Sequence, residues 1–145
     1  MAGTKTFFII KPGAVSHEHI GPILAMINSA GFHIAALKLI MLDHYHAEHF
    51  YAVHRSKPFF ESLVRFMTSG PVVIGILEKE NAVVDYRKLM GATDPAKAEE
   101  GTIRKLFAES IERNAVHGSD SDENAEKECD FFFAKGERFS KFDEE

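Results

Sequence analysis

Thr6-Phe7-Phe8-Ile9-Ile10, stopped by Lys11-Pro12-Gly13, is the stretch from which the fold can be worked out. A short apolar run that is rich in strand-forming residues and ends at a proline and a glycine predicts a buried β-strand. Two further segments have the same character: residues 32–42, which are apolar apart mainly from Lys38, and Val72-Val73-Ile74-Gly75-Ile76-Leu77-Glu78. The sequence therefore predicts a sheet. The segments between these strands determine what packs against its faces.

Those intervening segments have the spacing of helices. Ile20, Ile23, Leu24 and Ile27 recur at helical spacing, and Gly31 follows where such a helix would end. Further helices are predicted over residues 45–53, 59–68, 81–90 and 102–110 and from Asp120 to about Lys127, with a last strand over 129–133. Strands and helices in this order predict an α+β fold with helices covering one face of the sheet, although several topologies fit the pattern.

Length and composition are those of one globular domain. Of 145 residues, 45% are hydrophobic and 27% charged, so residues 1–145 are predicted to form a single domain whose tail from about residue 135 is a surface arm. No apolar run is long enough to cross a bilayer, and the first strand begins too early to leave room for a signal peptide. The single cysteine, Cys129, excludes an intramolecular disulfide and favours a reducing compartment, so we expect a cytoplasmic protein.

The charge balance restricts the class of partner. A formal net charge of −5 disfavours broad binding to nucleic acid or to an anionic membrane, both of which need a basic surface. We therefore expect neither as a partner. A small anionic ligand remains compatible with this charge if lysines and arginines gather around it locally.

The stretch Asn114-Ala115-Val116-His117-Gly118-Ser119-Asp120-Ser121 is too small and polar for a core segment and is predicted to be a functional loop. No bulky neighbour shields His117, and Gly118 lets the backbone approach a ligand closely. Ser119 and Asp120 can form local hydrogen bonds. These features favour a nucleophile or general base at His117, whereas the simpler alternative is a surface histidine in a turn.

Residues 114–121 resemble the active-site signature of the nucleoside diphosphate kinase family. Six other segments resemble this family in the family's order: Lys11-Pro12-Gly13-Ala14-Val15, Phe50-Tyr51-Ala52, Lys57-Pro58-Phe59-Phe60, Met67-Thr68-Ser69-Gly70-Pro71-Val72, Met90-Gly91-Ala92-Thr93-Asp94-Pro95-Ala96 and Gly101-Thr102-Ile103-Arg104. The resemblance covers all but about the last dozen residues. It implies a ferredoxin-like α/β sandwich with an antiparallel four-stranded sheet, and a homo-oligomer that is a tetramer or a hexamer.

The same resemblance implies a phosphotransferase reaction. The γ-phosphoryl group of a nucleoside triphosphate, mainly ATP, would pass to a nucleoside diphosphate through a phosphohistidine on His117, which maintains the nucleoside and deoxynucleoside triphosphate pools. The nucleotide would bind as its Mg²⁺ complex, with the metal held mainly through the phosphates. The sequence has no Gly-x-x-x-x-Gly-Lys-Ser/Thr loop, so side chains would have to bind those phosphates.

Individual roles are carried over by the resemblance. His117 would be phosphorylated on Nδ1, with the Glu128 carboxylate holding the other ring nitrogen. The catalytic residues would be His117, Glu128, Lys11, Tyr51 and Ser119, and the nucleotide-binding residues would be Lys11, Phe59, Leu63, Arg87, Thr93, Arg104, Ile111, Asn114 and Gly118. Cations in this set suit phosphoryl transfer, which depends on positioning and charge neutralisation, while an aromatic ring stacks on any base.

Alternatives remain at this stage. His44, His46, His49 and His54 lie within eleven positions, so a metal site competes with a solvated histidine-rich face. A phosphohistidine carrier that accepts phosphate from a partner protein would also use His117, and a silent family member could serve as a scaffold. The sequence departs from the family pattern in three places: Gly13, Ser16-His17-Glu18-His19 and Lys105-Leu106.

Overall fold

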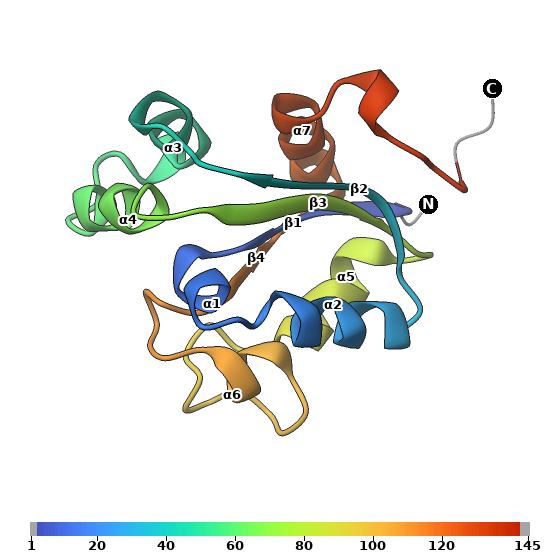
Figure 1. Ribbon diagram of the computed structural model, residues 1–145, viewed down its shortest axis with the longest axis horizontal. Helices are drawn as coiled ribbons and strands as arrows, with labels where there is room; N and C mark the ends of the chain where they lie inside the picture. The colour runs from blue at the N-terminus through green and yellow to red at the C-terminus, as the bar shows by residue number, and fades with distance from the viewer. Residues whose placement is uncertain (1–2, 143–145) are drawn as a thin grey trace.

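The computed structural model describes residues 3–142 as a four-stranded antiparallel sheet with flanking helices (Figure 1). The strands are β1 (Lys5–Ile10), β2 (His33–Ile40), β3 (Val72–Glu78) and β4 (Val116–Gly118). The α-helices are α1 (Pro12–Ser16), α2 (Ile20–Ser29), α3 (His44–Phe50), α4 (Phe60–Met67), α5 (Ala82–Met90), α6 (Ile103–Phe107) and α7 (Asp122–Phe132). Two short 3₁₀ helices are η1 (Ala52–His54) and η2 (Lys135–Glu137).

The strand order β2-β3-β1-β4 places the run Thr6–Ile10 in an interior strand. β1 pairs antiparallel with β3, where Phe8 lies opposite Gly75, and with β4, where Ile9 lies opposite His117. Interior strands are enclosed by neighbours and by helices, which explains why both alternating faces of β1 are apolar. A shift in register between Ile34 and Ala36 makes Ala35 a bulge residue in the edge strand β2.

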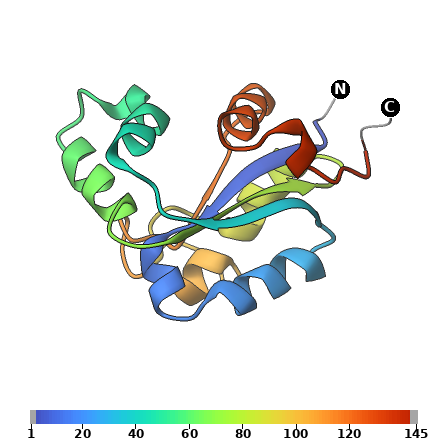
Figure 2. The same cartoon turned by 45° about the horizontal axis from the view of Figure 1, so that its top comes forward.

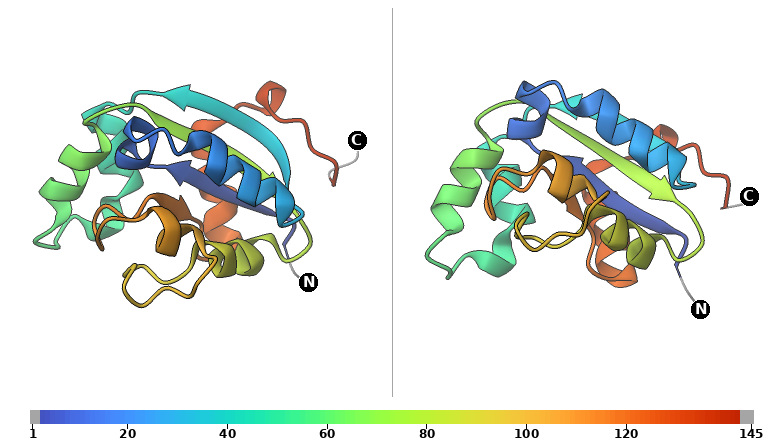
Figure 3. Two further views of the ribbon diagram at one scale, coloured as in Figure 1. Left: turned by 60° about the horizontal axis from the view of Figure 1, so that its bottom comes forward. Right: turned by 90° about the horizontal axis from the view of Figure 1, so that it is seen from below.

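The buried side chains form one core on each face of the sheet. Phe8 and Ile10 belong to the core beneath α2 and α5, while Phe7 and Ile9 belong to the core shared with α4 and α7. Figure 2 shows α3, α4 and α7 on one side of the sheet and α2 on the other, and Figure 3 shows the α2, α5 and α6 side. The predicted antiparallel four-stranded α+β fold is confirmed, with helices on both faces where the sequence suggested one.

Two local predictions were wrong. Residues 129–133 are not a strand, because α7 continues to Phe132 and buries Cys129 against the sheet. A short apolar run does not distinguish a strand from a buried helix turn by its pattern alone. The predicted loop at 114–121 instead contains the fourth strand, β4, which is only three residues long and pairs with β1.

The segment after α7 lies along the first half of β2. Phe139 N donates a hydrogen bond to the carbonyl of the bulge residue Ala35 at 2.7 Å, and His33 Nε2 lies 2.8 Å from Phe139 O. Lys141 N donates to Glu78 Oε1 at 2.8 Å. Residues 1–2 and 143–145, included in the predicted single domain, lie outside the described residues. Within residues 3–142, no helix is both long enough and apolar enough to cross a membrane.

Candidate active site

The imidazole of His117 lies on β4 with one nitrogen fixed by a carboxylate. His117 Nε2 lies 3.1 Å from Glu128 Oε1, and each side chain is 20% exposed. An ionised carboxylate only accepts hydrogen bonds, so Nε2 carries the proton and the neutral ring keeps its lone pair on Nδ1. Within residues 3–142, Nδ1 makes no hydrogen bond. The geometry therefore leaves the Nδ1 lone pair available.

A second hydrogen bond orients the carboxylate itself. Ser119 Oγ donates to the same Glu128 oxygen at 2.7 Å and accepts from Phe7 N at 3.1 Å. Ser119 N donates to Phe7 O at 3.2 Å, which extends the contact between β4 and β1, and Ser119 is fully buried. The sheet thus fixes Ser119, Ser119 fixes Glu128, and Glu128 fixes the ring of His117.

Two aromatic residues that the sequence analysis did not select contact His117. The Phe50 ring meets the imidazole edge to face with centroids 5.1 Å apart, and the Phe7 centroid is 6.1 Å away. The predicted supporting residue, Tyr51, makes no ring contact or hydrogen bond with His117 in the described part of the chain. Its hydroxyl is buried without a partner, and burial raises the pKa of Tyr51. The sequence contains one indication of a role for Phe50, which is that it precedes Tyr51 in the segment Phe50-Tyr51-Ala52 that resembles the family.

Gly118 has a packing reason for lacking a side chain. A Cβ at this position would lie 2.7 Å from Tyr86 Cδ2 and 2.8 Å from Met90 Cε. Tyr86 is fully buried in α5, so its ring cannot move aside cheaply. The glycine therefore lets β4, the strand that carries His117, pack directly against α5.

Lys11 is a buried cation at the end of β1. The residue is 6% exposed, and its backbone N–H donates to Ala115 O at 2.9 Å. Ala115 has a φ of 76°, a left-handed conformation that costs energy in a residue with a Cβ. Burial, together with the positive charge of Arg104, lowers the pKa of Lys11 to about 7, and the Glu112 carboxylate acts in the opposite direction.

Arg104 is held by three backbone carbonyls. Its Nε donates to Asn114 O at 3.3 Å, Nη1 to Gly91 O at 3.1 Å and Nη2 to Val116 O at 2.9 Å. The residue is only 8% exposed, and burial lowers the pKa of its guanidinium. A guanidinium has five N–H groups, so two of them remain for a ligand.

Three of the predicted phosphate-binding residues line one cavity of about 370 Å³: Arg87, Thr93 and Arg104. Arg87 is exposed, and its guanidinium makes no hydrogen bond or ion pair with any residue from 3 to 142. The cavity also includes Lys88 and Lys97. Cations are therefore concentrated here in a chain whose net charge is negative.

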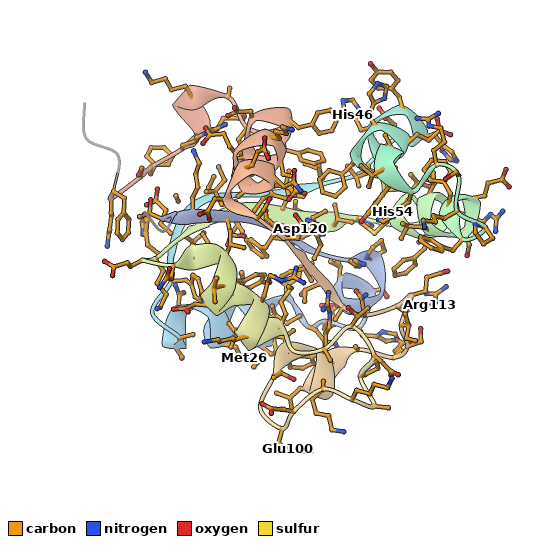
Figure 4. All side chains as sticks on the ribbon, turned by 180° about the vertical axis from the view of Figure 1, so that it is seen from behind. Met26, His46, His54, Glu100, Arg113 and Asp120 are labelled. Atoms are coloured by element: carbon orange, nitrogen blue, oxygen red, sulfur yellow. The ribbon has the colours of Figure 1, made fainter. Side chains whose placement is uncertain are left out.

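The predicted base-binding residues belong to two segments. Phe59 precedes α4 and is 45% exposed, with its ring 5.4 Å from that of His54, whereas Leu63 is buried one turn later. On the loop between α6 and β4, Ile111 is 59% exposed and accepts at its carbonyl from Asn114 Nδ2 at 2.9 Å. Asn114 Oδ1 is buried without a partner. Figure 4 labels His54 on the first segment and Arg113 on the second.

The histidine-rich segment makes local contacts. His46 Nδ1 lies 2.8 Å from Asp43 Oδ1, and His49 Nδ1 lies 3.2 Å from Tyr45 O. Between residues 3 and 142, no three His, Cys, Asp or Glu side chains are grouped so that they could hold a metal ion. These contacts favour the solvated histidine-rich face over the metal site.

Comparison with known proteins identifies relatives over nearly the whole chain. A family model described as nucleoside diphosphate kinase matches residues 4–138. Nucleoside diphosphate kinase of Flavobacterium psychrophilum is 56% identical over 139 residues, which cover 96% of this chain and 100% of the relative. That of Rhizorhabdus wittichii is 58% identical over 133 residues, covering 92% and 95%.

Solved structures give the same result. The chain superposes on the nucleoside diphosphate kinase of Aquifex aeolicus with a TM-score of 0.91 at 40% identity, covering 93% of this chain and 98% of the other. The TM-score with the enzyme of Halobacterium salinarum, solved in complex with CDP, is 0.90 at 36% identity, covering 97% and 93%. These likenesses confirm the ferredoxin-like α+β fold.

Proposed function

This chain belongs to the nucleoside diphosphate kinase family, and from that premise we propose which of its residues perform each step of the reaction. The protein transfers the terminal phosphoryl group of a nucleoside triphosphate to a nucleoside diphosphate. We assign the nucleophile to His117. The observation that carries this assignment is the free Nδ1 of an imidazole whose Nε2 is bound to Glu128 at 3.1 Å.

In the first half of the reaction, the Nδ1 lone pair attacks the γ-phosphorus. The Nδ1–P bond forms while the bond from phosphorus to the bridging β–γ oxygen breaks, and the nucleoside diphosphate leaves with that electron pair. Nε2 keeps its proton, and Glu128 stabilises the positive charge that develops on the ring. In the second half, a terminal phosphate oxygen of another nucleoside diphosphate in the same pocket attacks the phosphorus. The new O–P bond forms while the Nδ1–P bond breaks, and the electron pair returns to Nδ1 and restores the neutral imidazole.

The remaining residues serve binding. We assign Lys11, Arg87, Thr93 and Arg104 to the phosphate oxygens, because cations neutralise the charge on the transferred group. Catalytic support is assigned to Ser119 through Glu128 and to Tyr51 through its unpartnered hydroxyl. We assign the nucleoside to Phe59, Leu63, Ile111 and Asn114, with Gly118 allowing close approach of the backbone. Measuring the affinity for nucleotide after alanine substitution at Phe59 tests whether this ring stacks on the base.

A nucleotide kinase uses a divalent cation, and we propose Mg²⁺. The cavity that contains Arg87 and Arg104 is lined mostly by cationic and neutral residues, and no three His, Cys, Asp or Glu side chains within residues 3–142 are grouped to hold a metal ion, so the site fits a metal ion carried in by the nucleotide better than one resident in the protein. Such an ion would be held mainly by phosphate oxygens and would neutralise charge on them. Restoration of activity by Mg²⁺ after chelation measures this requirement.

We further propose a homo-oligomer, a tetramer or a hexamer, built from a single-domain chain. The edge strand β2 and the segment that follows it expose Leu37, Leu39 and Met41, which are 46%, 63% and 61% accessible. Exposed apolar side chains on the second half of an edge strand favour association. Light scattering distinguishes these assemblies from a monomer.

A cytoplasmic location fits the reduced, buried Cys129 and is tested by cell fractionation.

We expect nucleotide binding to become proton-linked above neutral pH. Lys11 has a pKa of about 7 in the free protein, and bound phosphates favour its charged form, so its pKa rises on binding. Between the two values, binding takes up a proton, and the affinity falls as the pH rises above about 7. Calorimetry of Mg–ADP at pH 8 in two buffers of different ionisation enthalpy measures the uptake. Lys11→Met should remove it, and equal uptake by both proteins would contradict the assignment.

The reaction itself is tested by intact-protein mass after mixing with Mg–ATP. We expect a gain of one phosphoryl group that is acid-labile and disappears when GDP is added, as GTP forms. This result also separates the kinase from a phosphohistidine carrier, which nucleotide alone would not phosphorylate. A folded protein that gains no mass under ATP would overturn the assignment of His117.

A further inference from the structure

One polar contact joins the two segments that carry the proposed nucleoside-binding residues. Ser62 Oγ lies 2.9 Å from both Glu112 Oε1 and Glu112 Oε2, and both side chains are partly buried. Ser62 belongs to α4, one residue before Leu63, and Glu112 lies between Ile111 and Arg113 on the loop from α6 to β4. We call this contact the Ser62–Glu112 pair. It joins α4 to the loop that carries Ile111 and Asn114.

Neighbouring contacts keep this loop in a defined position. The Arg113 guanidinium lies 4.6 Å from the ring centroid of Phe66, two helical turns from the start of α4. Arg113 N donates to Ser110 Oγ at 3.0 Å, which closes the loop on itself. The loop therefore contacts α4 at two points, one ionic hydrogen bond and one cation–π contact, and each depends on a side chain that the family signature does not include.

We propose that the Ser62–Glu112 pair sets the separation of the two nucleoside-binding segments, and that Glu112 is a positioning residue. The inference rests on the proposed roles of Phe59, Leu63 and Asn114. The hydrogen bond joins a residue next to Leu63 to a residue two positions before Asn114, so it acts where the two segments carry the residues that we assign to the nucleoside.

The experiment measures Mg–ADP binding by calorimetry in Ser62→Ala, in Glu112→Ala and in the double variant. Each single variant should lower the affinity about fivefold, and the double variant should be no weaker than Glu112→Ala, because each change removes the same shared contact. Ser62→Thr keeps the hydroxyl and should bind as wild type. Glu109→Ala is the matched control, since this exposed carboxylate of the same loop lies 3.2 Å from His17 and should not affect binding.

Rescue by the conservative variant separates positioning from packing. Ser62→Thr retains a hydroxyl that can donate to Glu112, so it should keep the affinity that Ser62→Ala loses. Unchanged affinity in both single variants, additive losses in the double variant, or a loss in Ser62→Thr equal to that in Ser62→Ala would overturn the proposal. Because binding of Mg–ADP requires no phosphoryl transfer, a wild type that fails to become phosphorylated would count against His117 and not against this pair.

Discussion

Replacement of His117 by alanine is expected to abolish the phosphorylated form of the protein and to lower transfer from ATP to GDP by at least about 10⁴-fold. The neighbouring Ser119 and Cys129 cannot substitute for Nδ1. Ser119 is fully buried, and its hydroxyl is engaged by Phe7 N and Glu128. Cys129 is buried, and burial raises its pKa to about 12, so it stays a thiol at neutral pH. Intact-protein mass after Mg–ATP measures the result.

The matched control is His49→Ala. His49 is exposed on α3, and its Nδ1 lies 3.2 Å from the carbonyl oxygen of Tyr45 in the same helix, so this variant should gain and lose the phosphoryl group as wild type does. Thermal unfolding of His117→Ala should stay close to wild type, because the imidazole is partly exposed and contributes one hydrogen bond. A stable mass gain in His117→Ala would show that another residue receives the phosphoryl group.

The sequence predicted the interior of the sheet better than its edge at β4. Continuous apolar runs ending at proline or glycine identified β1 and β3, since strands enclosed on both faces cannot be polar. β4 has three residues, and its pairing depends on the position of β1 rather than on its own composition. The aromatic residues near 132 suggested a strand because helix and strand are not separable over so short a run.

The candidate site divides in the same way. His117, Glu128 and Arg104 were predicted because their identities and order resemble a family, and the structure brings the first two into contact. Contacts between segments that are distant in sequence could not be predicted from the sequence. The edge-to-face contact of Phe50 with His117 and the bond from Ser62 to Glu112 depend on how α3 and α4 pack against the rest of the chain.

Replacement of Arg104 by lysine is expected to damage both the reaction and the fold. A lysine keeps the charge but cannot reach the carbonyls of Gly91, Asn114 and Val116 together, so at least one buried carbonyl loses its partner. We expect a loss of about 2 kcal/mol in the free energy of unfolding, or about 4–8 °C in Tm. Phosphorylation of His117 should slow by about 10²–10³-fold, because a preorganised planar donor is removed. Denaturant unfolding and quenched-flow mass measurements report the two effects.

Arg87→Lys is the informative comparison, because Arg87 lines the same cavity without bonding to the rest of residues 3–142. It should slow phosphorylation while leaving Tm unchanged. The three carbonyls that accept from Arg104 belong to the turn after α5, to the loop between α6 and β4, and to β4, so this one guanidinium joins three segments at the proposed phosphate site. If Arg104→Lys slowed the reaction without lowering Tm, those three hydrogen bonds would contribute nothing to stability, and Arg104 would act on phosphate alone.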